Sequence, residues 1–172
     1  MRSLVQEAEG RPSPALPSLS PELAAAVLGA RRRAARGADP QIDTAHLLHS
    51  LLESDQGTRE SLSGDEPARL GRLLGYLVQR SIGYGLVWQT RAEGPEAQAE
   101  TWWGGVSGWS PKAAAALNGA LVRARLRRAE YATGRDLMAA LLADPECRAV
   151  EVLRSAGLDP MGETGRMGER AC

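Results

Sequence analysis

The amino-acid sequence predicts an all-α protein in which two pseudo-symmetric repeats of about four helices each pack as one domain. Three observations support this prediction. Alanine and leucine supply most of the hydrophobic residues, aromatic residues make up only 4% of the chain and Phe is absent, a composition that favours helix over sheet. Apolar residues recur at helical spacing in several segments. A segment of the first half also recurs, without a gap, 90 residues further along.

Charge, cysteine content and hydropathy limit the class of protein. The 172 residues include 21 basic and 21 acidic ones, and this zero net charge does not favour a dedicated nucleic-acid or membrane-binding protein. Two cysteines, Cys147 and Cys172, are too few for a disulfide scaffold and fit a reducing compartment. The longest apolar run, residues 23–30, is too short to cross a bilayer, and the first residues lack a signal-peptide core. We therefore expect a cytoplasmic protein.

The first half contains the signals of four helices. Residues 1–18 mix Pro, Ser and charged residues without periodicity and predict a flexible lead-in. Ser20-Pro21 predicts a helix start, because Ser caps free backbone N–H groups and Pro fits the first helical position. That helix ends at Gly37–Pro40, and Asp43 or Thr44 caps a second, leucine-rich helix. A short third helix around 58–62 and a fourth over 67–80 follow.

Residues 81–108 interrupt the helical pattern with six glycines and three tryptophans. They predict an insertion or linker with a short strand at 86–90. Trp88, Trp102 and Trp103 either pack this insertion onto the domain or bind a ligand.

The second half restarts at Ser110-Pro111. Shifted by 90 residues, twelve of the 33 positions from 20 to 52 are identical, and the equal distance from Ser-Pro to the leucine-rich helix does not depend on alanine content. Thr133 predicts a helix cap to which Asp136 reaches back. A further helix over 146–156 ends at Gly157, and Asp159-Pro160 opens a short last one.

This duplicated order of elements resembles the N-terminal domain of the Clp ATPases, the double Clp repeat of ClpA, ClpB and ClpC-type unfoldases. That family begins each repeat with an aromatic residue, then Ser or Thr, then often Pro; here the sequence reads Leu19-Ser20-Pro21 and Trp109-Ser110-Pro111. The family's Thr-Glu-His-Ile-Leu is similar to residues 44–48, TAHLL, and its Val-Leu-x-x-Leu-Gly to VLRSAGLD at 152–159. The resemblance covers about residues 17–160.

The resemblance implies a division of the chain into domains. The sequence also departs from the family pattern at three places. The first repeat spans 19–80, the insertion 81–108, the second repeat 109–160 and a tail 161–172, after the lead-in 1–18. The departures are the insertion itself, a third helix cut short by Ser63-Gly64 in the first repeat, and the residue after Thr. Some members bind phosphorylated arginine through a Glu there; Ala45 and Arg135 stand in its place, so we do not expect that activity.

The sequence offers little catalytic or metal chemistry. It has no phosphate-binding loop of the G-x-x-x-x-G-K-[ST] type. Asp43, His46 and His49 could offer metal ligands on one helix, but the family's His at the position of His46 implies packing or capping, and His49 is interpreted as a surface residue. Cys147 is interpreted as a buried structural thiol. We predict no enzyme, no metal and no cofactor.

The function implied by the resemblance is protein binding. We expect the chain to dock adaptors, substrates or peptides of the Clp chaperone-protease system, as a free-standing adaptor or decoy, with Clp ATPase or protease components, adaptors or client peptides as its partners. The alternative is a nucleic-acid-binding regulator that uses its arginine-rich helices. If the arginines do not bind nucleic acid, they either form solvent-exposed helix faces or bind an acidic partner. They are Arg31, Arg32, Arg33, Arg123, Arg125, Arg127 and Arg128.

The resemblance also implies where a partner docks. In the family, hydrophobic ligands lie near the starts of the first helices of the two repeats, which predicts Trp109 and its counterpart Leu19 as binding residues, with Leu28, Arg31 and Asn118 along the same surface. A partly exposed Trp at a helix start has the profile of an interface anchor. The alternative is that Trp109 is buried and closes the hydrophobic staple of its helix.

Overall fold

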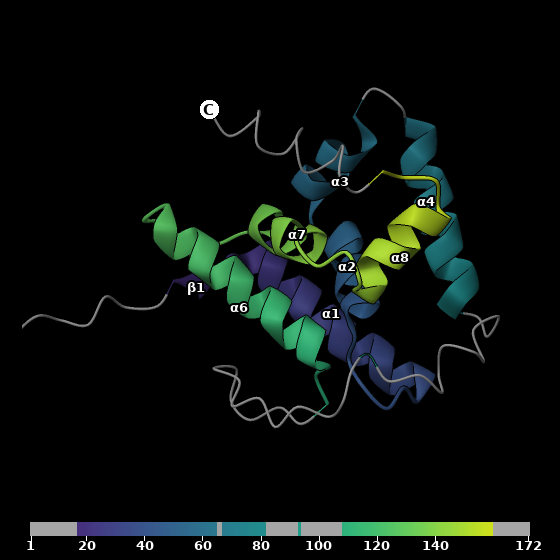
Figure 1. Cartoon of the computed structure of the whole chain (residues 1–172), viewed down its shortest axis with the longest axis horizontal. Helices are drawn as coiled ribbons and strands as arrows, with labels where there is room; N and C mark the ends of the chain where they lie inside the picture. The colour runs from purple at the N-terminus through teal and green to yellow at the C-terminus, as the bar shows by residue number, and fades with distance from the viewer. Residues whose placement is uncertain (1–16, 65–66, 82–92, 94–107, 160–172) are drawn as a thin grey trace, which may run out of the picture.

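The computed structural model describes residues 17–64, 67–81, 93 and 108–159, and within them the chain is helical, as predicted (Figure 1). Two two-residue strands accompany the helices. The elements are β1 (Ser18–Leu19), α1 (Pro21–Gly37), α2 (Thr44–Ser54), α3 (Gln56–Ser63), α4 (Pro67–Ser81), α6 (Pro111–Leu126), β2 (Tyr131–Ala132), α7 (Gly134–Leu142) and α8 (Arg148–Ser155).

The predicted helix starts are confirmed by their caps. The Ser20 hydroxyl accepts the N–H of Leu23 at 3.2 Å, and the Ser110 hydroxyl accepts the N–H of Ala113 at 3.0 Å. A proline follows each of these serines at the first helical position, where its missing N–H costs no hydrogen bond. Helices α1 and α6 therefore begin with the same local chemistry.

Two short parallel pairings join the repeats crosswise. Leu19 of β1 pairs with Ala132 of β2, and an isolated bridge pairs Ile42 with Trp109. The 90-residue offset carries Leu19 onto Trp109 and Ile42 onto Ala132, so it exchanges one pairing for the other. In each case the residue that leads into the first helix of one repeat pairs with the residue before the second helix of the other.

The first two helices of each repeat cross at a glycine. A Cβ added to Gly29 of α1 would lie 3.0 Å from Cβ of Ser50 on α2. At the equivalent place, a Cβ on Gly119 of α6 would lie 3.1 Å from Cβ of Ala140 on α7. A small residue on both helices lets their backbones approach closely, and the repeated crossing supports the predicted alignment of the two halves.

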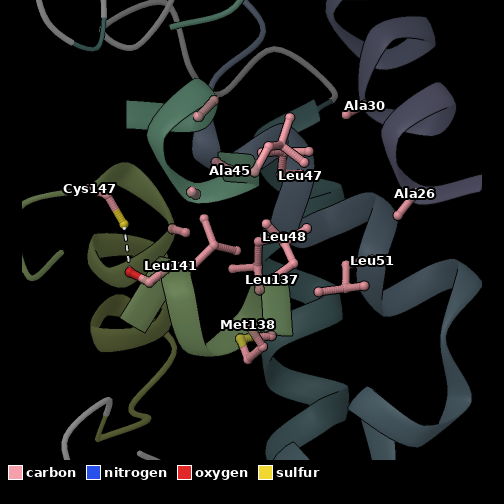
Figure 2. Packing of buried hydrophobic residues seen from close by; sticks show 14 of the residues in the cluster. Ala26, Ala30, Ala45, Leu47, Leu48, Leu51, Leu137, Met138, Leu141 and Cys147 are labelled. Carbon is pink, nitrogen blue, oxygen red and sulfur yellow. Dashed lines mark hydrogen bonds between the residues drawn. The ribbon is translucent and has the colours of Figure 1, made fainter. Parts of the chain in front are cut away.

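The hydrophobic core is shared by both repeats. Helix α2 lies in the middle of the molecule and packs against α1, α3, α6, α7 and α8 (Figure 1). Figure 2 shows Leu48 of α2 with Leu137 and Met138 of α7 in this buried cluster. Leu51 and its counterpart Leu141 are both buried. The two repeats therefore form one packing unit.

Some details differ from the sequence-based expectations. Helix α3 has eight residues, the same as α8, so the first repeat's third helix is not cut short relative to its counterpart. Helix α8 begins at Arg148, because Asp144 and Pro145 form a turn in which the Asp144 carboxylate accepts the N–H of Glu146. The predicted lead-in, the strand at 86–90, the three tryptophans of the insertion and the last helix lie outside the described residues.

Candidate functional site

The five residues predicted to bind a partner are placed differently from one another. Leu28 is 52% exposed and Arg31 is exposed, both on α1, whereas Leu19 and Asn118 are partly buried. Trp109 is only 7% exposed, which corrects the expectation of a partly exposed anchor. Its backbone is held by the bridge to Ile42 and its indole packs in the core, where the N–H finds no acceptor among the described residues. A role for these five residues in binding stays a prediction.

A groove of about 520 Å³ lies between α6 and α7. Its lining is mostly apolar: Ala115, Gly119, Val122 and Leu126 come from α6 and Ala140 from α7. Val122 is 55% exposed and Leu126 is 79% exposed, so the groove opens to the surface. Large apolar side chains grouped on a surface commonly mark an interaction site.

The equivalent surface of the first repeat is charged. The alignment places Arg32 at the position of Val122, Arg36 at that of Leu126 and Glu53 at that of Ala143, which also lines the groove. In the first repeat Arg33 pairs with Glu53 and donates to the Ser50 hydroxyl at 3.2 Å, across the crossing of α1 and α2. Because the fold forms the same helix crossing without an apolar surface, folding alone does not account for the exposed Val122 and Leu126.

Charged side chains flank the groove. Lys112 donates to the Asp144 carboxylate at 2.9 Å. Burial acts to raise the pKa of Asp144, but the hydrogen bonds from Lys112 and from the N–H of Glu146, with the charge of Lys112, lower it overall. Arg123 matches Arg33 of the first repeat, but Ala143 offers it no carboxylate, and it pairs with no acidic side chain among the described residues.

Thr44 and Cys147 form the inner end of the groove, and both are buried. The Cys147 thiol donates to the Leu141 carbonyl at 3.3 Å (Figure 2). Burial raises the pKa of this thiol, which keeps it protonated and unreactive at neutral pH. The interpretation of Cys147 as a structural thiol agrees with this environment.

Next to Thr44 lies a buried carboxylate, that of Glu93. One of its oxygens accepts the N–H of Thr44 at 2.9 Å and the hydroxyl of Ser110 at 2.7 Å. The other accepts the N–H of Arg148 at 2.7 Å and the hydroxyl of Thr44. The carboxylate thus joins the starts of α2, α6 and α8, and so links the two repeats.

An ion-pair network continues from this point. The Arg148 guanidinium binds the Asp43 carboxylate at 2.5 Å, and Asp43 caps α2 by accepting the N–H of His46 at 2.9 Å. The His46 ring accepts the N–H of Asp43 in return and lies 2.9 Å from the Asp39 carboxylate. Burial acts to lower the pKa of His46, but hydrogen bonds and charges from Asp43 and Asp39 raise it overall.

Asp43 and His46 of this network form the capping box of α2. In the part of the chain that the structure describes, no three His, Cys, Asp or Glu side chains gather as a metal site requires. His49, interpreted from the sequence as a surface residue, is buried, and its ring lies 3.6 Å from Glu53.

No family model matches the sequence, and none of the curated proteins matches it. Solved structures do. The N-terminal domain of Hsp104 from Candida albicans has a TM-score of 0.63 and 14% identity, over 87% of this chain and 89% of that one. The N-terminal domain of the caseinolytic protease associated chaperone ClpD from Arabidopsis thaliana has a TM-score of 0.61 and 16% identity, over 90% of this chain and 97% of that one. The chain has the fold of a Clp N-terminal domain.

The Clp N-domain fold accounts for the duplicated architecture, but it does not single out the groove or Glu93. The groove has a sequence signal that a comparison of the two repeats would have found: Arg32 and Arg36 are replaced by Val122 and Leu126. Glu93 has none, because it is one acidic residue in a segment without periodicity. Among the described residues, no helix is both long and apolar enough to cross a membrane.

Proposed function

We propose that this chain is a protein-binding module of the Clp chaperone-protease system, which acts as an adaptor or decoy. Its partners are client or adaptor segments that bind in the groove between α6 and α7. The Clp N-domain fold supports the class of function, and the groove supports the place. Trp109, Leu19, Leu28, Arg31 and Asn118 belong to a second predicted surface around the helix starts, which the experiment below compares with the groove.

The observation that carries this proposal is the difference between the repeats. Both repeats form the same helix crossing, but at two matching surface positions the second exposes Val122 and Leu126 where the first has Arg32 and Arg36. Exposed Val and Leu side chains are costly to hydrate, and covering them with an apolar partner returns about 25 cal/mol per Å² of buried surface.

The charges around the groove indicate the chemistry of the partner. In the first repeat the Glu53 carboxylate neutralises Arg33, whereas Ala143 stands at the position of Glu53 in the second repeat and the matching Arg123 donates to the Ala139 carbonyl instead. A partner segment that carries an acidic residue beside its apolar residues would supply the missing carboxylate. We therefore propose a short apolar segment with an adjacent Asp or Glu as the ligand.

A peptide library tests the proposal. Each member is a short, Leu- and Val-rich peptide made in a Glu and a Gln version, and binding is measured by fluorescence anisotropy. We expect Glu versions to bind the protein better, and Val122→Asp to weaken the best binder by about tenfold or more, as expected for a central contact residue.

Two matched variants provide the controls. Leu28 and Val78 are 52% and 47% exposed, close to the 55% of Val122, so Leu28→Asp and Val78→Asp introduce the same charge at a similar exposure. Unchanged binding by both supports the groove, and a loss only in Leu28→Asp would move the site to the helix starts. Failure of every peptide to bind would contradict the proposed function.

Salt dependence separates the nucleic-acid alternative. Arg33 and Arg127 are paired with Glu53 and Asp136, which leaves less of the basic surface for phosphates. We expect peptide binding to change little between low and moderate salt, whereas binding through phosphate contacts would fall steeply.

A further inference from the structure

The two places where a third helix of one repeat meets the second helix of the other differ in their chemistry. At the first, Asp55, the N-cap of α3, faces Gly134, the first residue of α7. A Cβ added to Gly134 would overlap Oδ2 of Asp55. The same carboxylate accepts the N–H of Thr58 at 3.1 Å and its hydroxyl at 2.9 Å. This junction is filled by the cap of its own helix.

At the second junction the helix cap offers no carboxylate. Helix α8 begins against Thr44, the first residue of α2, and its N-cap is Cys147, whose side chain makes no capping hydrogen bond. Glu93 supplies the carboxylate instead. It accepts the N–H of Arg148, the first residue of α8, which lies 55 positions further along the sequence. Only 6% of Glu93 is exposed.

The donors at this second junction are arranged for a carboxylate. All four described partners of the Glu93 oxygens donate. The hydroxyl of Thr44 already accepts the N–H of Ala149, and that of Ser110 accepts the N–H of Ala113, so the proton of each hydroxyl is directed at the carboxylate. The N-termini of α2 and α8, whose backbone N–H groups donate to the carboxylate, add partial positive charge.

The same donors disfavour a phosphate. None of the four groups is a charged side chain, and the Arg148 guanidinium is bound to Asp43. A buried site of this kind compensates one negative charge far better than two. The ligand class that fits is therefore a monocarboxylate.

We propose that this junction is a carboxylate-binding site in which Glu93 is the intramolecular ligand and whose place an external carboxylate can take. Thr44 belongs both to this site and to the lining of the groove. The side chain of an Asp or Glu in a segment bound in the groove is thus the external carboxylate that lies nearest to this site. This last point, the source of the ligand, rests on the proposed function.

The first test replaces the ligand by a free one. Glu93→Ala leaves the donors without an acceptor, so we expect its melting temperature to fall by several degrees. Sodium acetate, up to ~0.1 M, should then restore much of the loss by mass action, and sodium phosphate or chloride at equal ionic strength should not. The wild-type protein should not respond, because Glu93 is present at high effective concentration. The matched control is Thr44→Val in the Glu93→Ala background, which we expect to respond to acetate several-fold less.

Equal effects of acetate on the wild type and on Glu93→Ala, or no effect on either, would overturn the proposal. A second variant serves if Glu93→Ala does not fold. Cys147→Asp places a capping carboxylate where α3 has Asp55, so it should raise the melting temperature of the Glu93→Ala protein and lower that of the wild type through repulsion by Glu93. The same effect in both backgrounds would also contradict the proposal.

The peptide library separates this inference from the proposed function. Glu93→Gln keeps the size of the side chain but removes its charge, and we expect it to bind Glu peptides several-fold more tightly than the wild type does, with Gln peptides unaffected. Equal affinities would show that a bound segment does not reach the site. If no peptide binds either protein, the proposed function fails while the acetate result still decides whether the site exists.

Discussion

At the residue scale, His46 is a partly buried histidine that lies beside two carboxylates. Its ring lies 2.9 Å from Asp39 and 2.8 Å from Asp43, and Asp43 is also bound to Arg148. When Nδ1 is protonated, the ring donates to the Asp43 carboxylate in place of accepting the Asp43 N–H, and the hydrogen bonds and charges of the two carboxylates raise the pKa of His46 despite its burial.

His46 therefore predicts a pH-dependent stability. Because its pKa in the folded protein is raised above the value of 6.5 for an unperturbed His, its contribution is fully present below that value and is lost as the pH rises through the raised pKa. We expect the free energy of unfolding, measured with urea, to fall across this range in the wild type. His46→Gln keeps a capping side chain that does not titrate and should flatten the curve. Parallel curves for the two proteins would contradict the assignment.

Gly134 is a second residue with a measurable role. A Cβ at this position would overlap Asp55 and lie 2.8 Å from both Leu51 Cδ1 and Thr58 Oγ1. Gly134→Ala should destabilise the protein by ~1–3 kcal/mol, the usual cost of overpacking. Gly71→Ala on α4 is the matched control, because nothing lies within 4 Å of its Cβ, and alanine there should stabilise the helix by about 0.5–1 kcal/mol. Thermal or urea unfolding measures both, and equal effects would show that the crowding at Gly134 is unimportant.

At the element scale, α1 and α6 start alike but are connected differently. Ser20 and Ser110 both cap their helices, and Ser110 also donates to Glu93. Ser20→Ala should cost ~1 kcal/mol, the usual value of an N-cap. Ser110→Ala removes in addition a hydrogen bond to a charged group, so its cost should exceed that of Ser20→Ala by ~1–2 kcal/mol. Urea unfolding of the two variants gives this difference, which should vanish in a Glu93→Ala background.

The leucine-rich helices α2 and α7 should respond alike to truncation. Leu51 and Leu141 occupy matching positions and are both buried in the shared core. Each Leu→Ala change should cost ~2–5 kcal/mol in unfolding experiments, from lost burial and the cavity left behind. A near-neutral result for one of them would mean that the core is not shared equally between the repeats.

At the scale of the whole molecule, the repeats depend on each other. The crosswise pairings and the position of α2 among helices of both repeats leave neither half with a closed core. We expect the fragments 17–81 and 82–159 to be largely unfolded when separate and to gain helical circular dichroism when mixed. Full helicity of either fragment alone would contradict this.

The sequence predicted the helices, their caps and the duplication, because these depend on local chemistry such as Ser-Pro starts and leucine spacing. It did not predict β1, β2 or the bridge at Trp109, because two-residue pairings carry no periodicity and depend on the meeting of distant segments. For the same reason the sequence placed Trp109 at a helix start but left a partly exposed anchor and a buried residue as alternatives, and the structure shows the buried one. The partners of Glu93 lie 17 to 55 positions away, beyond the reach of any local pattern.

The crosswise pairings also bear on the ancestry of the chain. Because the 90-residue offset exchanges the two pairings, a protein of one repeat could close both of them with a second identical copy, as a symmetric dimer does. Fusing two such copies turns a symmetric association into a single chain and releases each copy from the need to stay identical. Val122 of α6 and Arg32 of α1 then illustrate such divergence, because one copy carries an exposed apolar side chain at the position where the other carries a charged one.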